Sequence, residues 1–263
     1  MTFEILVSCM TDHILKLIDN INLNSSAVII NQCGRQGYEE LVHNGNKVKI
    51  YYSSEKGLTK SRNKALQKST ADICLLCDDD EQLNDECQKR VIGAFEEFPD
   101  ADIIVFKVKN FDKKLKNKVY KLKYSDLFRV ASIQIAFKRE SILSDGIFFD
   151  EILGSGTGNG AEEELAFLME CRKRRKTIYY YPAEIATLKE SNSTWFEAYG
   201  ETFFFQRGKT TRYILGIFLS EIYAIYYVAA KHHMYKKDIS FWKAFKAIHK
   251  GIYDDKLQRT SYY

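Results

Sequence analysis

Short apolar runs alternate with stretches of mixed polarity through the first part of the chain. The runs are residues 3–9, 27–32, 47–53 and 72–77, and their length and β-branched content are typical of strands. A polar segment follows the first run, and a helical pattern over residues 58–67 precedes the last. This alternation predicts a mainly parallel sheet with helices on its faces, so ligand-binding residues should follow the ends of the strands.

A second section continues the pattern without an intervening linker. Further apolar runs occupy residues 101–109, 118–123, 130–138 and 177–181, and a glycine-rich loop precedes the last of them. We therefore predict one α/β domain over residues 1–190, with halves at 1–100 and 101–190. A helical extension over residues 191–263 should follow it.

The extension contains one long apolar stretch, from Tyr213 to Ala230, whose only charged residue is Glu221. A membrane span needs about 20 apolar residues, and a carboxylate near its centre costs about 2.5–3.5 kcal/mol on insertion scales. We therefore expect a helix that is buried or lies in a membrane interface. Paired with the basic stretch Ser240–Lys250, it would form a foot on one face of a membrane.

The positive charge of the chain is concentrated at its C-terminal end. The whole chain carries +4, whereas residues 231–263 alone contain eight Lys or Arg and three Asp. The aromatic residues mixed into this segment, Phe241, Trp242 and Phe245, favour an anionic membrane surface over nucleic acid as its partner. A basic helix that is simply solvated explains the pattern equally well, so both interpretations stay open.

The composition indicates an ordered protein in a reduced compartment. Hydrophobic residues make up 45% of the chain, and only two residues are proline. Six cysteines, and a start without a basic segment or cleavage site, favour a cytoplasmic setting. Cys74 and Cys77 share one predicted strand, where residues three apart face opposite sides, so we interpret them as core residues. We expect a cytoplasmic protein that is peripheral at the inner face of the cell membrane if its tail binds lipid.

Three adjacent carboxylates, Asp78, Asp79 and Asp80, follow the predicted strand at residues 72–77. They repel one another and would destabilise the end of the strand unless a cation neutralises them. Oxygen ligands suit Mg²⁺ or Mn²⁺, which bind through one or two carboxylates together with substrate phosphates. The alternative is a solvated acidic turn that caps the next helix.

A basic segment begins the helix that precedes this strand. Gly57 allows close backbone approach, and Lys60 and Arg62 supply positive charge suited to a diphosphate. Taken alone, the segment would be the ordinary start of a surface helix. Its position before the acidic strand end makes an anion site the better interpretation.

Together, the segments Ser8-Cys9-Met10, Ser61-Arg62-Asn63 and Cys77-Asp78-Asp79-Asp80 resemble the donor site of the family 2 glycosyltransferases, which have the Rossmann-like GT-A fold. The resemblance continues through residues 149–151 and the loop 154–160 to an acidic helix start at 162–164, and it covers residues 3–182. It implies a nucleotide-sugar half over residues 1–100 and an acceptor half over residues 101–190.

The resemblance also implies roles for single residues of the donor site. Asp80 would bind a divalent metal, Mn²⁺ or Mg²⁺, while Asp78 would bind the metal or the ribose, and Asp79 would hold the donor sugar. The family often has an Asp that accepts from uracil where this chain has Asn31, followed by Gln32, and an amide oxygen can accept the same bond. The other implied donor contacts are Ser8, Lys60, Arg62 and Asn63.

Glu163 and Glu164 match the acidic pair that supplies the catalytic base in this family, and Glu164 is the expected base. Glu162 is adjacent, so a register shifted by one residue stays open. Glutamates in the first turn of a helix also stabilise it by opposing the helix dipole, which accounts for one or two of the three.

The implied reaction is inverting transfer of one sugar from a UDP-sugar to a glycan or lipid-linked acceptor, in the synthesis of a surface polysaccharide such as a capsule. The Gln-x-x-Arg-Trp signature of processive synthases is absent, which favours addition of a single sugar. One alternative is a sugar-phosphate nucleotidyltransferase, although Ser8–Thr11 lacks the glycine-rich basic loop that it would need. The other is a non-catalytic, membrane-associated interaction module, which has no need for so many carboxylates.

Overall fold

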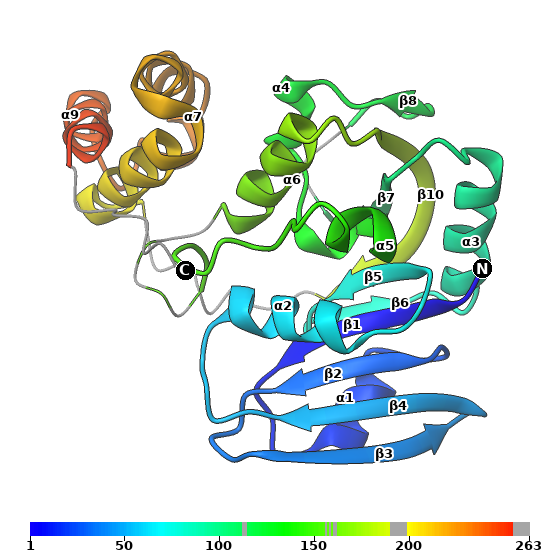
Figure 1. Cartoon of the computed structure of the whole chain (residues 1–263). Helices are drawn as coiled ribbons and strands as arrows, with labels where there is room; N and C mark the ends of the chain where they lie inside the picture. The colour runs from blue at the N-terminus through cyan, green and yellow to red at the C-terminus, as the bar shows by residue number, and fades with distance from the viewer. Residues whose placement is uncertain (112–114, 156, 158, 160–161, 190–198, 255–263) are drawn as a thin grey trace. The chain divides into compact units, whose positions relative to one another are not determined.

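The computed structural model describes residues 1–111, 115–155, 157, 159, 162–189 and 199–254. The chain divides into two compact units. The first comprises Met1–Phe149 and Glu164–Ser191, and the second combines Asp150–Glu163 with Asn192–Tyr263. Figure 1 traces the chain through both units. The division of residues 1–190 into a nucleotide-sugar half and an acceptor half stays a prediction.

The first unit is built on one mixed sheet. Its order is β3-β4-β2-β1-β5-β9-β7-β10-β6, with β8 paired to β10. Parallel pairing links β4, β2, β1 and β5, and also β7 and β10, whereas β9 is antiparallel to both β5 and β7. This architecture confirms the predicted α/β fold. The strands are β1 (Phe3–Cys9), β2 (Ala27–Asn31), β3 (Gly37–His43), β4 (Asn46–Tyr52), β5 (Ile73–Cys77), β6 (Glu81–Leu83), β7 (Ile103–Lys109), β8 (Tyr120–Lys121), β9 (Ile135–Lys138) and β10 (Ile178–Leu188).

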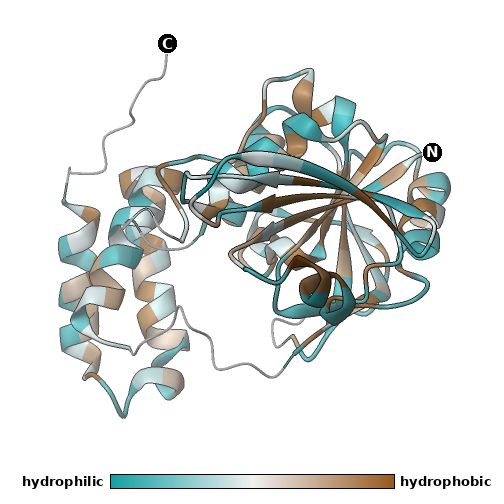
Figure 2. Ribbon diagram, turned by 90° about the horizontal axis from the view of Figure 1, so that it is seen from below, coloured by the Kyte–Doolittle hydropathy of each residue, from teal (hydrophilic) through white to brown (hydrophobic). Residues whose placement is uncertain are grey.

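Helices cover both faces of this sheet. Figure 1 shows α1 and α2 on opposite faces of the strands, as right-handed crossovers between parallel strands require. Because both faces are covered, β1, β2 and β5 are buried along their whole length, and Figure 2 shows hydrophobic residues along the central strands. The carboxyl ends of these three strands therefore meet at one edge of the sheet. The helices are α1 (Ile14–Asn20), α2 (Leu58–Lys68), α3 (Cys87–Glu97), α4 (Tyr124–Leu127), α5 (Arg139–Leu143) and α6 (Glu163–Lys173).

Two strands, β3 and the three-residue β6, were not predicted. β3 forms a hairpin with β4, although most of its residues are exposed and the apolar pattern predicts no strand there. The turn is Asn44-Gly45, and both residues have a positive φ, of 49° and 78°. An Asn-Gly pair with this backbone is the strongest local signal of a tight hairpin, so turn chemistry rather than hydrophobic periodicity marks this strand.

The second unit contains α7 (Glu201–Ala230), α8 (His232–Tyr235) and α9 (Phe241–Ile252). α7 is broken at Gly216, whose φ of 75° and ψ of 173° suit only glycine. Arg207 donates to the hydroxyl of Tyr223 at 2.9 Å, although 16 residues of straight helix would separate them by about 24 Å. The two halves of α7 therefore fold back on each other as a hairpin.

This break bears on membrane insertion. By length and composition, α7 is the one helix in the described residues that could cross a membrane. A span needs about 20 consecutive residues in a single rod. Neither half of the hairpin, residues 201–215 or residues 217–230, is that long.

α9 crosses the first half of α7 at a pair of glycines. A Cβ atom added to Gly208 would overlap the carbonyl oxygen of Ile248, and one added to Gly251 would overlap that of Phe205. The two backbones therefore approach as closely as glycine allows. Side chains from both halves of α7, from α8 and from α9 surround this contact as a separate hydrophobic cluster, which includes Phe204, Ala224, Val228, Tyr235, Ala244, Ile248 and Ile252.

Replacing Gly208 by alanine should destabilise the second unit by about 1–3 kcal/mol, because the added methyl group forces two backbones apart. Gly93 in α3 provides the control, since a Cβ there meets no atom within 4 Å, and its replacement by alanine should be neutral or stabilising by about 0.5–1 kcal/mol. Urea unfolding followed by circular dichroism compares the two variants. Equal stability of both would contradict the close crossing.

Candidate functional site

A buried guanidinium lies at the centre of the candidate site. Arg62, on α2, is 2% exposed. Its Nη2 atom donates to both carboxylate oxygens of Asp78, at 3.1 and 3.2 Å, and its Nη1 atom lies 3.5 Å from Oε1 of Glu164. Because a buried charge is costly unless it is paired, Arg62 holds the acidic end of β5 and the acidic start of α6 around one positive charge.

Aromatic stacking fixes α6 against this centre. The rings of Phe149 and Phe167 stack with centroids 4.3 Å apart, and the Arg62 guanidinium lies 5.5 Å from the centroid of Phe149. The side-chain amide of Asn63 donates to the backbone carbonyl of Phe149 at 2.9 Å and accepts from the backbone N–H of the same residue at 2.8 Å. Asn63, predicted to contact the donor, is thus engaged in positioning the chain that precedes α6.

The ends of β1 and β2 are braced by their own polar side chains. Ser61 donates to Ser8 across 2.9 Å, which joins α2 to β1. The Asn31 amide accepts from the backbone N–H of Thr11 at 3.1 Å and donates to its carbonyl oxygen at 2.7 Å. The structure therefore places Ser8 and Asn31 at the expected edge of the sheet, where they shape the backbone that follows β1.

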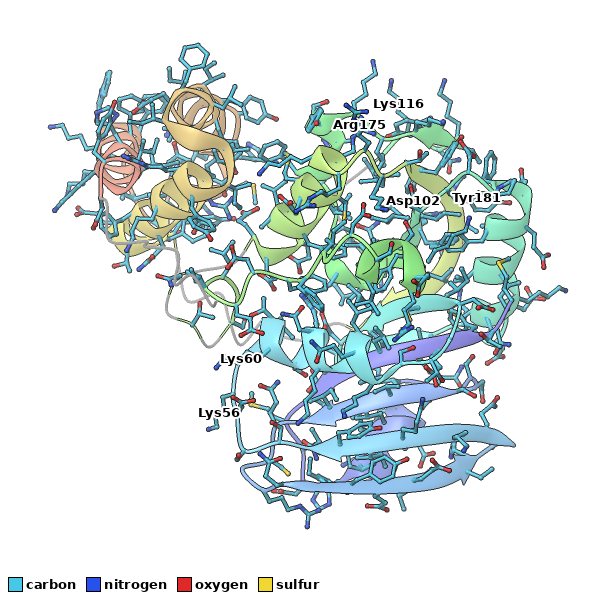
Figure 3. The ribbon with its side chains drawn as sticks, viewed as in Figure 1. Lys56, Lys60, Asp102, Lys116, Arg175 and Tyr181 are labelled. Carbon is cyan, nitrogen blue, oxygen red and sulfur yellow. The ribbon has the colours of Figure 1, made fainter. Side chains whose placement is uncertain are left out.

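The start of α2 carries the cations that reach solvent. Lys60 is half-buried and Lys56 is exposed, and both are labelled in Figure 3 at the beginning of this helix. The backbone N–H of Gly57 donates to the side-chain oxygen of Gln32 at 2.7 Å, which fixes the helix start to the end of β2. Lys60 is therefore better placed than the buried Arg62 to meet an anion from solvent.

The three aspartates after β5 are not equivalent. Asp78 accepts from Arg62 and also from the hydroxyl of Ser132 at 3.0 Å, so its charge is balanced within the protein. Asp79 and Asp80 are more exposed to solvent than Asp78, although protein atoms still surround part of each carboxylate. Partial burial, and then repulsion from neighbouring carboxylates, raises the pKa of each. Two carboxylates at this strand end thus carry negative charge that the surrounding residues do not fully offset.

The site includes side chains that the sequence did not suggest. Glu81 is fully buried and accepts from the backbone N–H of Asp78 at 2.7 Å. Burial and the nearby Asp78 raise the pKa of Glu81 well above its usual range. The backbone N–H of Lys189, beyond β10, donates to the Asp80 carbonyl at 3.2 Å. Lys189 and Ser132 come from distant parts of the chain, so no local pattern could have identified them.

The glutamates at the start of α6 differ in the residues that they contact. Glu164 faces Arg62, as described above. Glu162 instead forms an ion pair of 2.6 Å with Arg207 in the second unit, and Glu163 is buried. Glu164 therefore shares the Arg62 guanidinium with Asp78.

No group of three or more His, Cys, Asp or Glu side chains in the described residues is arranged to hold a metal ion by itself. Mg²⁺ and Mn²⁺ do not need one, because they usually bind one or two carboxylates, waters and substrate phosphates. Asp79 and Asp80 offer hard oxygen donors and excess negative charge. The residues present therefore fit a divalent cation that binds together with a phosphate ligand.

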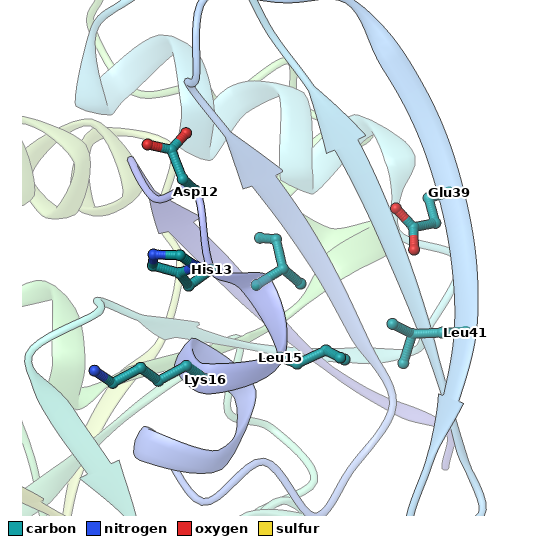
Figure 4. A pocket seen from close by; sticks show the side chains of 7 residues that line it. Asp12, His13, Leu15, Lys16, Glu39 and Leu41 are labelled. Carbon is teal, nitrogen blue, oxygen red and sulfur yellow. The ribbon is translucent and has the colours of Figure 1, made fainter.

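A cavity of about 610 Å³ lies between the start of α1 and β3. Figure 4 shows Asp12 and His13 on one side of it, and Glu39 and Leu41 of β3 on the other. None of the predicted site residues is among those that line this cavity. Its lining mixes acidic, basic and apolar side chains, unlike the row of carboxylates after β5.

Comparison of the sequence with protein families identifies the chain. The family described as glycosyl transferase family 2 matches residues 11–149, more than half of the chain. The protein belongs to glycosyl transferase family 2. The match includes Asn31, Lys60, Arg62 and the three aspartates, and it ends before Glu163 and Glu164. Comparison with curated proteins gives no match.

Solved structures confirm the fold of this family 2 glycosyltransferase. Residues 1–349 of S. aureus TarS in complex with UDP-GlcNAc match with a TM-score of 0.57 and 14% identity, over 96% of this chain and 72% of that one. The same TarS fragment in complex with UDP matches with a TM-score of 0.56 and 14% identity, over 96% of this chain and 71% of that one. The mannosyltransferase PcManGT from Pyrobaculum calidifontis, in complex with GDP-Man and Mn²⁺, matches with a TM-score of 0.55 and 12% identity, over 95% of this chain and 73% of that one. At these identities the likeness establishes the fold.

Replacing Asp80 by asparagine should stabilise the metal-free protein, because it removes one charge from a repelling row. We expect a rise of about 1–3 °C in the melting midpoint at neutral pH, since 1 kcal/mol corresponds to about 2–4 °C in a chain of this size. Thermal melts in EDTA measure the change, and Glu96→Gln, at an exposed position of α3, is the control. A lower midpoint for Asp80→Asn would contradict the repulsion.

The pH dependence of this gain follows from the raised pKa of Asp80. A carboxylate with a raised pKa binds its proton more tightly in the folded state, so its destabilising effect grows as the pH rises through that pKa. The advantage of Asp80→Asn should therefore be full at neutral pH and shrink as the pH falls toward about 4, the unperturbed value. Melts at a series of pH values check this trend.

Proposed function

We propose that the protein transfers one sugar from a UDP-sugar to a hydroxyl group of a glycan or lipid-linked acceptor, with inversion, in the synthesis of a surface polysaccharide. Membership of glycosyl transferase family 2 supports glycosyl transfer. The observation that carries the proposal is the double pairing of Arg62, which brings a donor-site carboxylate, Asp78, and the candidate base, Glu164, to one guanidinium.

The donor would bind at the carboxyl ends of β1, β2 and β5. UDP as the nucleotide is supported by the TarS complexes with UDP and UDP-GlcNAc. Lys60 would approach the diphosphate, and Asp79 the donor sugar. Ser8, Asn31, Arg62 and Asn63 would act mainly by holding the backbone and the acidic side chains in position, because the structure shows all four engaged with protein partners.

A divalent cation, Mn²⁺ or Mg²⁺, would be held by Asp80 and Asp78, together with oxygens of the diphosphate. The Mn²⁺ in the mannosyltransferase complex supports this choice of ion. When bound, such an ion neutralises negative charge on the departing diphosphate. Partial burial and repulsion from Asp78 raise the pKa of Asp80, so a neighbouring cation would favour its charged form.

Glu164 is the proposed base, and Glu163 is the second candidate. The Glu164 carboxylate would take the proton from the acceptor hydroxyl while the hydroxyl oxygen bonds to the anomeric carbon of the sugar. The bond from that carbon to the diphosphate breaks at the same time, which inverts the configuration. Stacking of Phe149 on Phe167 and the ion pair with Arg62 hold α6 so that Glu164 stays beside the donor-site aspartates.

A donor panel tests the proposed chemistry. UDP-sugars should be hydrolysed slowly in the presence of Mn²⁺, with water as the acceptor, and EDTA should abolish the release of UDP. GDP-mannose belongs in the same panel because of the mannosyltransferase likeness. Release of nucleotide from every donor at the rate of buffer alone, with Mn²⁺ present, would contradict the proposal.

Replacing Glu164 by glutamine should lower the rate of transfer by about 10²–10⁴-fold, the usual contribution of a general base. The affinity for UDP, measured by titration calorimetry, should change little. Glu170→Gln is the matched control, since Glu170 lies on the same helix and pairs with Arg174 at the surface. If Glu164→Gln keeps its activity while Glu163→Gln loses it, the base is Glu163.

A further inference from the structure

The second half of α7 exposes a continuous apolar face. Six large hydrophobic side chains on residues 217–226 are between 44% and 74% exposed. Their spacing places most of them along one side of the helix, where positions three, four and seven apart come together. The exposed residues of this apolar face are Ile217, Phe218, Leu219, Ile222, Ile225 and Tyr226.

Packing within the unit does not account for this face. The opposite side of the same half-helix already supplies the buried residues Ser220, Ala224 and Val228, and the last two belong to the cluster with α9. Glu221, the only charged residue in the stretch, pairs with His249 of α9 at 3.1 Å. The apolar face therefore has no charge of its own, and it is larger than scattered exposed side chains would give.

The charge of the surrounding unit indicates what could cover this face. Residues 199–254 contain nine Lys or Arg against four Asp or Glu, and Arg207 is already paired with Glu162. Five lysines and an indole ring, 70% exposed, lie at the surface of α9 and of the segment before it. These residues are Lys236, Lys237, Trp242, Lys243, Lys246 and Lys250.

We propose that the second unit docks on an anionic lipid bilayer, with the apolar face of α7 inserted among the lipid chains at the interface. Apolar burial and attraction between lysines and anionic headgroups act together at such a surface. The break at Gly216 keeps the two halves of α7 short and side by side, so the hairpin lies in the interface and does not cross it. A second copy of the chain is disfavoured as the occupant, because it would bring two strongly basic units together.

Vesicle sedimentation of the full-length protein tests the docking. The protein should bind phosphatidylcholine vesicles that contain phosphatidylglycerol, bind pure phosphatidylcholine more weakly, and lose the difference at high salt. Phe218→Glu and Ile225→Glu should each lower the binding by about tenfold or more, because a charge replaces an inserted apolar side chain. Both residues are exposed, at 74% and 58%, so the fold should tolerate the changes.

Val42→Glu is the matched control, since Val42 on β3 is 73% exposed but lies in the first unit. It should bind vesicles like the wild type. All three variants should hydrolyse UDP-sugars at the wild-type rate, so a failure of docking is distinguishable from a failure of the proposed chemistry. The proposal would be overturned if Phe218→Glu bound the anionic vesicles as strongly as the wild type does. It would also be overturned if the wild-type protein did not bind them. Light scattering that shows a dimer which Phe218→Glu converts to a monomer would overturn it as well.

Discussion

The site depends on one buried cation. Arg62 is almost fully enclosed, and a guanidinium in that position is tolerated only if carboxylates lie close to it. Asp78 and Glu164 meet this need from two elements that are far apart in the sequence. The requirement to pair Arg62 therefore determines where the end of β5 and the start of α6 lie, and so brings the two sets of acidic residues together.

This pairing divides the work among three adjacent aspartates. Asp78 is balanced by Arg62 and Ser132, so it holds the end of β5 in place and is also one of the two proposed metal ligands. Asp79 and Asp80 keep raised pKa values, because each is partly buried and because the repulsion from neighbouring carboxylates is not offset in the same way. A row of like charges that would be unfavourable in an ordinary turn thus contains one carboxylate that protein partners balance and two whose negative charge is less fully balanced, which suits a cation that binds with a phosphate ligand.

The sequence predicted the elements that have a strong apolar pattern. The strands β1, β2, β4 and β5 and the helix α2 form close to the expected residues, because burial on both faces makes their periodicity clear. β3 was missed because it is exposed and is marked only by its turn. The backbone break at Gly216 was not predicted either, because the sequence does not show whether an isolated glycine in an apolar helix has a helical or a positive φ.

The candidate site was predicted in location more than in detail. The residue types and their order pointed to the carboxyl ends of the strands, where the structure has Ser8, Asn31 and Asp78, and their roles in binding stay predictions. The sequence could not show that Arg62 faces inward to Asp78 rather than outward to a ligand, or that Glu162 and Glu164 have different arginine partners. These are tertiary contacts between side chains from different elements, and only the fold determines them.

Anomalous diffraction at the manganese edge, from crystals grown with UDP and Mn²⁺, directly tests whether the aspartates after β5 hold a metal together with the diphosphate. A metal held at this strand end should give a manganese peak in direct contact with the carboxylate of Asp80 and with the diphosphate of UDP, while Arg62 stays paired with Asp78. UDP bound at the ends of β1 and β2 with no manganese beside residues 78–80, or with Arg62 released to contact the diphosphate, would contradict this arrangement.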